Sequence, residues 1–339
     1  MAEYKAPLRD MRFVLTELFD FNDINQMPGC EDFTPDVVDA VLEEAAKVCE
    51  EVLYPINRSG DEEGCHWDDG VVTTPKGFKE AYKTFAEGGW TGIACDPTYG
   101  GQGAPKSINA LVEEIICSSN LSFGMYPGLS FGAYAALHSH ASDTLKDKFL
   151  PKMVEGTWAG TMCLTEPHCG TDLGIIKSKA DPLDDGSYAI TGTKIFISAG
   201  EHDLTENIIH LVLAKLPDAP KGTKGISLFL VPKFMVGDDG SLGDRNAVKC
   251  GSIEHKMGIK ASSTCVMNFD GAVGYLVGEP HQGMPAMFTM MNQERLSVGI
   301  QGLGLGEAAY QGARAYAKDR LQGRALTGAK SPDKAADSI

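Results

Sequence analysis

The first 157 residues are dominated by apolar side chains that recur every three or four positions. Such spacing places the apolar residues on one face of a helix and the charged residues on the other. The segments with this pattern are residues 8–18, 35–53, 75–87 and 107–140. Gly88-Gly89 would end the third of them. They predict an N-terminal α-helical domain over residues 1–157.

The pattern changes at Trp158, after which short apolar runs alternate with Gly, Asp and Pro residues. Runs of this length bounded by turn residues are typical of β-strands, and two Asp-Asp-Gly turns favour antiparallel pairing. The runs are residues 187–190, 194–198, 208–214, 227–232 and 264–269. We therefore predict that residues 158–278 form a middle domain that folds as an antiparallel β-barrel.

Helical spacing returns after Gly278 and continues from Met284 to Ala317. Each glycine in a helix costs about 1 kcal/mol relative to alanine, so a concentration of glycines predicts close backbone packing or a ligand there. The glycines concerned are Gly299, Gly302, Gly304 and Gly306. A lone helix of this kind cannot bury its apolar face, so residues 279–339 are expected to be the first helix of an incomplete C-terminal bundle. The predicted fold class is α+β multidomain.

Composition restricts the classes of function. With 339 residues and 43% hydrophobic content the chain can bury a sizeable core, and a formal net charge of −16 disfavours binding to nucleic acid or an anionic membrane. Nine cysteines without a C-x-x-C pair indicate a reducing compartment rather than a disulfide framework or a zinc site. No signal-peptide pattern follows Met1 and no window approaches a membrane span, so the expected location is the cytoplasm.

Two short motifs point to other enzyme classes but lack the required context. Residues 128–132 match the G-x-S-x-G pattern of serine hydrolases, with His138 and His140 nearby, yet the pattern needs a preceding β-strand and residues 110–117 have helical spacing. Gly302-Leu303-Gly304 begins a dinucleotide fingerprint, but Glu307 occupies the position of its third glycine. A hydrolase and a nicotinamide enzyme are therefore disfavoured.

Residues 162–174, M-C-L-T-E-P-H-C-G-T-D-L-G, join an apolar run to a polar loop. Pro167 lacks the donor of a strand ladder, so the strand cannot simply continue past Glu166. The loop presents backbone amides and the Thr171 hydroxyl, which could hold a flat polar ring on one side and an anion on the other. A tight connection between two strands is the alternative. Cys163 and Cys169 are interpreted as packing residues.

Two further positions carry candidate chemistry. Phe196 and Ser198 lie two apart on a predicted strand, so both face one side and could present an aromatic plane and a hydroxyl to a ligand. A half-buried strand face is the alternative. Arg295 lies beside the glycine-rich helix face and could contact an anionic or carbonyl-bearing ligand, or could be a solvated surface residue.

Four motifs in a fixed order resemble the acyl-CoA dehydrogenase family. They are C-L-T-E-P with G-T-D (163–172), T-G-T-K-I-F-I-S (191–198), E-H-K-M-G-I (254–259) and E-R-L (294–296). Cys169 departs from the usual Gly, Ala or Ser, and Phe196 from the usual Trp. Residues 4–11 and the long insert before residues 250–254 resemble a subgroup that includes 3-methylmercaptopropionyl-CoA dehydrogenases.

The resemblance implies FAD-dependent α,β-dehydrogenation of an acyl-CoA thioester, with 3-methylmercaptopropionyl-CoA as a candidate. It also implies an electron-transfer flavoprotein as electron acceptor and a homodimer or homotetramer. The implied flavin contacts are Cys163, Leu164, Thr165, Gly170, Thr171, Phe196, Ile197, Ser198, Arg320 and Gln322. The implied substrate contacts are Thr171, Asn292 and Arg295. The family usually has Phe-Gly after the arginine that matches Arg320, and this chain does not.

The resemblance places the catalytic base in the carboxy-terminal bundle, and no position up to Ile339 matches it. Glu166 belongs to the loop motif, and Glu294 is interpreted as favouring a helix start or pairing locally. Neither is assigned as the base, and the chain is expected to be a fragment of the family's fold. An acyl-CoA oxidase-like enzyme and a non-catalytic relative that binds flavin or acyl-CoA are the alternatives.

Overall fold

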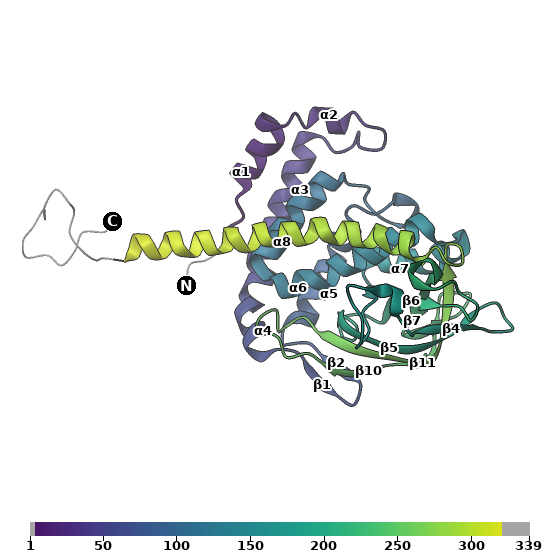
Figure 1. The fold of residues 1–339 in the computed structure, drawn as a ribbon. Helices are drawn as coiled ribbons and strands as arrows, with labels where there is room; N and C mark the ends of the chain where they lie inside the picture. Colours follow the sequence, from purple (N-terminus) through teal and green to yellow (C-terminus); the bar gives the residue numbers. More distant parts are fainter. Residues whose placement is uncertain (1–3, 321–339) are drawn as a thin grey trace, which may run out of the picture.

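The computed structural model describes residues 4–320, in which a helical region packs against a β-sheet region and one long helix crosses both (Figure 1). The predicted helical segments are confirmed, and π-helical turns extend α1 to Leu18 and α3 to Leu53. The helices of this region are α1 (Leu8–Phe13), α2 (Asn22–Asn25), α3 (Pro35–Val48), α4 (Asn57–Glu63), α5 (Phe78–Glu87), α6 (Lys106–His140) and α7 (Asp143–Glu155).

The helical region also contains a short hairpin that the periodicity did not predict. Strands β1 (His66–Asp68) and β2 (Val71–Thr73) pair antiparallel around Asp69-Gly70. Both turn residues have positive φ, 40° for Asp69 and 92° for Gly70, as a two-residue hairpin turn requires. The Asp-Gly pair beside two valines was the available signal.

Helix α6 is divided by a kink at Asn120, whose φ and ψ of −158° and 88° are not helical. The Asn120 side chain stabilises the kink, because Oδ1 accepts from the Phe123 backbone N–H at 3.1 Å and Nδ2 donates to the Leu53 carbonyl at 3.0 Å. Asn120 thereby acts as an N-cap for the second half of the helix. Both halves of the helix carry residues that line the pocket described below.

The sheet region contains seven paired strands and one separate hairpin. The strands are β3 (Trp158–Cys163), β4 (Lys179–Pro182), β5 (Tyr188–Ser198), β6 (Asn207–Lys215), β7 (Ile226–Pro232), β8 (Phe234–Val236), β9 (Leu242–Arg245), β10 (Val248–Ile253) and β11 (Thr264–Val277). The seven-stranded sheet has the order β10-β11-β5-β4-β6-β3, and β7 pairs with both β11 and β6. Strands β8 and β9 pair with each other.

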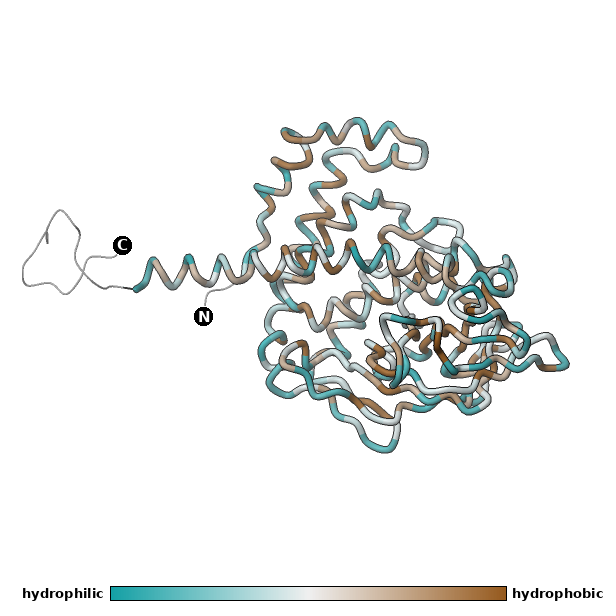
Figure 2. Tube along the Cα trace, viewed as in Figure 1, coloured by the Kyte–Doolittle hydropathy of each residue, from teal (hydrophilic) through white to brown (hydrophobic). Residues whose placement is uncertain are grey.

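The prediction of an antiparallel barrel is met only in part. The pairs β11–β5, β5–β4, β6–β7 and β7–β11 are antiparallel, but β3 and β4 each pair with β6 in parallel. Two predicted runs, 187–190 and 194–198, belong to the single strand β5. The central strands β6 and β7 are buried along nearly their whole length, which explains their continuous apolar sequence (Figure 2).

The long helix predicted after Gly278 is confirmed as α8 (Gly283–Asp319), which packs on α6 and then projects beyond it (Figure 1). Close packing explains one of the four glycines noted in the sequence. A Cβ on Gly304 would lie 2.9 Å from the Ser118 backbone nitrogen of α6, whereas those on Gly299, Gly302 and Gly306 would meet no described atom within 4 Å. Several large apolar side chains of α8 are exposed: Leu296, Val298, Leu303, Leu305, Tyr310 and Tyr316.

Within the described residues, no helix has the length and apolar character that crossing a membrane would require.

Candidate functional site

The polar loop after β3 is fixed by a buried ion pair. Glu166 and Lys194 are 3% and 0% exposed, and the Lys194 ammonium donates to Glu166 Oε1 at 2.9 Å and to the Leu164 carbonyl at 3.0 Å. The Glu166 carboxylate also accepts from the backbone N–H groups of Lys177 at 2.7 Å and Ser178 at 3.0 Å. One carboxylate thus joins the start of the loop, its end and strand β5.

The charge of Glu166 follows from these contacts. Burial alone would raise the pKa of the carboxyl, but the Lys194 ammonium and the N–H donors of Lys177 and Ser178 lower that pKa to about 2. A carboxyl with so low a pKa stays ionised and does not exchange protons near neutral pH. The interpretation of Glu166 as a structural member of the loop agrees with this geometry.

The end of β5 presents an exposed aromatic ring. The pairing of β5 with β11 shifts register between Cys265 and Met267, so β5 carries a bulge at residues 195–196. There the Ile195 N–H donates to the Thr165 carbonyl at 2.8 Å, and Phe196 has a φ of 59° with its side chain 59% exposed. Positive φ is rare for a bulky aromatic residue and indicates a functional constraint.

The predicted loop and strand residues are brought together by these contacts. Phe196 and Ser198 are exposed and partly exposed on either side of the buried Ile197, and their placement on one side stays a prediction because Phe196 lies in the bulge. Gly170 and Thr171 are exposed on the loop, and Thr165 is joined to β5 through its carbonyl. Leu164, Cys163 and Cys169 are buried, so the interpretation of both cysteines as packing residues agrees with the structure.

Two predicted substrate residues lie together on α8. The Arg295 guanidinium donates to Asn292 Oδ1 at 2.9 Å and stands over the Phe288 ring at 5.3 Å from its centroid. Arg295 is therefore oriented although its side chain is exposed. Arg320 follows the end of α8, and Gln322 lies outside the described residues. A flavin contact for these last two positions stays a prediction.

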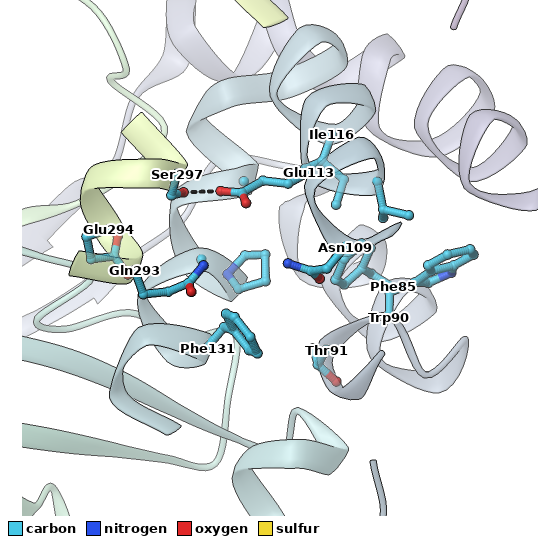
Figure 3. Close-up of a pocket in the computed structure, with 14 residues that line it drawn as sticks. Phe85, Trp90, Thr91, Asn109, Glu113, Ile116, Phe131, Gln293, Glu294 and Ser297 are labelled. Carbon is cyan, nitrogen blue, oxygen red and sulfur yellow. Dashed lines mark hydrogen bonds between the residues drawn. The ribbon is translucent and has the colours of Figure 1, made fainter. Parts of the chain in front are cut away.

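A pocket between α5, α6 and α8 has an aromatic wall and a polar end (Figure 3). The wall consists of Phe85, Trp90 and Phe131, and the polar end includes Glu113 of α6 and Glu294 of α8. Glu113 accepts a short hydrogen bond from the Ser297 hydroxyl. Oxygen Oε1 of Glu294 is buried and has no hydrogen-bond partner among the described residues.

The position of Glu294 differs from the interpretation made from the sequence. Helix α8 begins at Gly283, so Glu294 lies well inside the helix and neither caps it nor pairs locally. Burial raises its pKa to about 8, with a further contribution from Glu113, and burial also raises the pKa of Glu113. Gly132 of α6 leaves room for the carboxyl, since a Cβ there would collide with Glu294 Oε1. The raised pKa favours the protonated form of Glu294 at neutral pH.

The pocket and the loop are linked through α6. Ser130, beside Phe131, donates to the Tyr126 carbonyl at 3.0 Å and accepts from the Gly160 N–H of β3 at 3.0 Å. The hydroxyl therefore joins the pocket helix to the strand that leads into the loop. The G-x-S-x-G match lies entirely inside α6, without a preceding strand, which supports its exclusion as a hydrolase site.

Glu113 is the site residue that the sequence reasoning missed. Helical spacing places it on α6, where Glu113 and Glu114 interrupt a run of apolar positions. That interruption was the signal, but only the packing of α8 against α6 shows that Glu113 faces a second carboxyl.

Comparison with known families shows which family the chain belongs to. The models of the N-terminal and middle domains of acyl-CoA dehydrogenases match residues 36–157 and 161–272. The chain belongs to the acyl-CoA dehydrogenase family. Members of this family are flavin-dependent oxidoreductases. The loop after β3 and the exposed ring of Phe196 lie within the middle-domain match, and the pocket residues lie outside it.

Individual relatives agree with this assignment. The chain is 46% identical to 3-methylmercaptopropionyl-CoA dehydrogenase of Ruegeria pomeroyi, over 96% of this chain and 55% of that relative. The structure of butyryl-CoA dehydrogenase from Megasphaera elsdenii is similar with a TM-score of 0.71 and 27% identity, over 85% of this chain and 70% of that one. A structure described as an electron transferring flavoprotein of Acidaminococcus fermentans matches with a TM-score of 0.72, 27% identity and the same coverage. The chain spans about half the length of its curated relatives.

Proposed function

We propose that this chain forms the flavin-binding and acyl-binding part of an FAD-dependent acyl-CoA dehydrogenase. The observation that carries the proposal is the exposed ring of Phe196, held at positive φ two positions before the partly exposed Ser198. An aromatic plane beside a hydroxyl suits a flat, partly polar ring system such as the isoalloxazine of FAD. Strained backbone positions cluster at ligand sites, and here the strained residue carries an exposed ring.

The loop residues fit the rest of the cofactor. The exposed Gly170 and Thr171 offer backbone N–H groups and a hydroxyl, which are the donors that an anionic pyrophosphate needs. Leu164 and Thr165 are held by their carbonyls against β5, so their backbone is fixed next to the ring of Phe196. When bound, FAD would supply the acceptor for the hydride that leaves the β-carbon of the acyl group.

We assign the pocket of Figure 3 to the acyl group. Its aromatic wall would bury a short chain, and aromatic rings also make favourable contacts with a thioether sulfur. Together with the similarity to the Ruegeria pomeroyi enzyme, this supports 3-methylmercaptopropionyl-CoA as the substrate. Asn292 and the oriented Arg295 lie beside Gln293 and Glu294 of the pocket, where they could contact the CoA moiety.

Dehydrogenation also requires removal of the α-proton by a carboxylate. The family resemblance assigns this base to a later segment of the fold. The proposed role of Glu294 is therefore to hold a proton beside the acyl group, because its pKa of about 8 keeps it neutral at pH 7. An electron-transferring flavoprotein as electron acceptor and a homo-oligomeric assembly complete the proposal, and the similar Acidaminococcus fermentans structure supports the former.

The proposal is tested by adding 3-methylmercaptopropionyl-CoA, without oxygen, to the flavin-loaded full-length protein as its native host produces it. We expect loss of the visible flavin absorbance together with formation of the 2-enoyl-CoA, and a weaker response to butyryl-CoA. Flavin binding without bleaching by either thioester would contradict the dehydrogenase and favour a binding protein. Rapid peroxide formation in air would instead favour an oxidase.

A further inference from the structure

The most completely buried charged group of the site is Lys194, whose role extends beyond a single ion pair. It is one of the largest fully buried side chains of the described residues and lies two positions before the strained Phe196. Burying an ammonium is costly, and a buried ion pair seldom stabilises a fold more than apolar residues of the same volume. Its presence here therefore calls for a reason other than stability.

The contacts of Lys194 supply that reason. Its ammonium holds the Leu164 carbonyl and Glu166, while the next residue, Ile195, holds the Thr165 carbonyl. Three successive residues of the loop are thus attached to two successive residues of β5. At this point β5 bulges within its pairing with β11, and the Ile195 N–H at the bulge bonds to the loop.

The same contacts account for the backbone of Phe196. A φ of 59° strains a bulky residue and persists only where the surroundings hold the chain in place. The attachments at Lys194 and Ile195 hold the residues immediately before Phe196. Glu166 in turn holds the end of the loop through the N–H groups of Lys177 and Ser178.

We propose that the Lys194–Glu166 ion pair is a positioning device that fixes the loop carrying Thr165, Gly170 and Thr171 against the strand end carrying Phe196. The inference rests on the proposed function, in which these two segments contact different parts of one FAD molecule. With the pair intact, the aromatic plane and the anion-binding donors keep one spacing. Without the pair, the loop and the strand end would have to be ordered relative to each other when FAD binds, and this ordering would weaken binding.

The variant that tests the device is Lys194→Met, which keeps the length of the side chain and removes its charge. Lys233→Met is the matched control, because Lys233 also forms a largely buried ion pair, with Glu201, and has no hydrogen bond to the loop. We would measure the dissociation constant of FAD by fluorescence titration of the apo-protein, the visible circular dichroism of bound flavin, and the melting temperature of the apo-protein.

We expect Lys194→Met to raise the dissociation constant of FAD at least about tenfold, equivalent to about 1.4 kcal/mol, and to change the circular dichroism. Lys233→Met should lower the melting temperature comparably but leave FAD binding within about twofold, a change of under 0.5 kcal/mol by the same conversion. Equal FAD binding by the two variants would overturn the positioning role. If the wild-type protein binds no FAD at all, the proposed function fails instead.

A double variant covers the case in which Lys194→Met does not fold. Lys194→Met with Glu166→Gln leaves no buried charge unpaired, so most of the melting temperature should return. The Leu164 carbonyl has still lost its ammonium donor, and FAD binding should stay weak with an altered circular dichroism. Recovery of both stability and FAD binding in the double variant would show that the pair serves stability alone.

Discussion

The loop face around Phe196 and the pocket between α6 and α8 treat their carboxyl groups in opposite ways. Glu166 in the loop has three donors and a pKa of about 2, while Glu294 in the pocket has a buried oxygen without a described partner and a pKa of about 8. Both residues are poorly exposed, so burial alone does not decide the charge. The hydrogen-bond donors around each carboxyl decide its charge. A carboxyl whose oxygens all accept hydrogen bonds holds the structure together, whereas a carboxyl with an unpaired oxygen is a candidate for proton transfer or ligand binding.

The largest expected effect is the loss of the satisfied carboxyl. Glu166→Gln leaves the Lys194 ammonium buried without its counter-charge, so we expect the free energy of unfolding at pH 7 to fall by ~3 kcal/mol. Chemical denaturation of the variant and the wild type measures this difference. A loss below ~1 kcal/mol would mean that the loop does not depend on the ion pair.

Removing the unsatisfied carboxyl should have the opposite sign. The folded-state pKa of Glu294, about 8, lies above the value of about 4.3 in an unfolded chain, so the folded protein holds the proton more tightly. Its contribution to stability is complete below about pH 4.3 and is lost as pH rises through about 8. Glu294→Gln should therefore be more stable than wild type at pH 9, by on the order of 2 kcal/mol.

Denaturation curves between pH 5 and 9 measure the pH dependence attributed to Glu294. Glu113→Gln is the control, since it removes the neighbouring carboxyl and should lower the pKa of Glu294 without abolishing its titration. Parallel pH profiles for Glu294→Gln and the wild type would show that Glu294 has a partner that the described residues do not include.

The packing of the two pocket helices can be tested by a pair of identical substitutions. In Gly304→Ala the new Cβ would meet the backbone of α6 at Ser118, so we expect a loss of ~1–2 kcal/mol. In Gly302→Ala the Cβ has open space and the helix gains ~1 kcal/mol. Thermal unfolding compares the two variants, and a similar effect of both would mean that α8 is not held against α6 as described.

The sequence was sufficient for the order of a helical region, a β-sheet region and a long helix, because hydrophobic periodicity reports which face of each element is buried. It did not predict the β1–β2 hairpin, and the placement of Phe196 and Ser198 on one side stays a prediction. It could not show the bulge at residues 195–196, the burial of Lys194 or the approach of Glu113 to Glu294, because each depends on contacts between segments distant in the chain. Gly304 illustrates the limit: four glycines looked equivalent, and packing distinguishes one of them.

The smallest expected change in stability comes from Phe196, whose backbone strain concerns the fold and whose exposed ring concerns FAD binding. Glycine adopts positive φ without strain, so Phe196→Gly should relieve the backbone and remove an exposed ring, with a gain of up to ~1 kcal/mol in stability. If the ring is there for FAD, the same variant should bind FAD about tenfold more weakly, since stacking contacts of this kind contribute on the order of 1 kcal/mol.

Stability and FAD affinity should thus move in opposite directions for Phe196→Gly, which melting temperature and fluorescence titration measure on one preparation. Phe196→Tyr is the matched control, because it keeps the aromatic plane and the strained backbone and should leave both quantities near the wild-type values. A Phe196→Gly protein that loses stability and keeps its FAD affinity would mean that the ring serves the fold. The positive φ at residue 196 would then have a structural role, like the hydrogen bonds of Glu166, rather than a role in flavin binding.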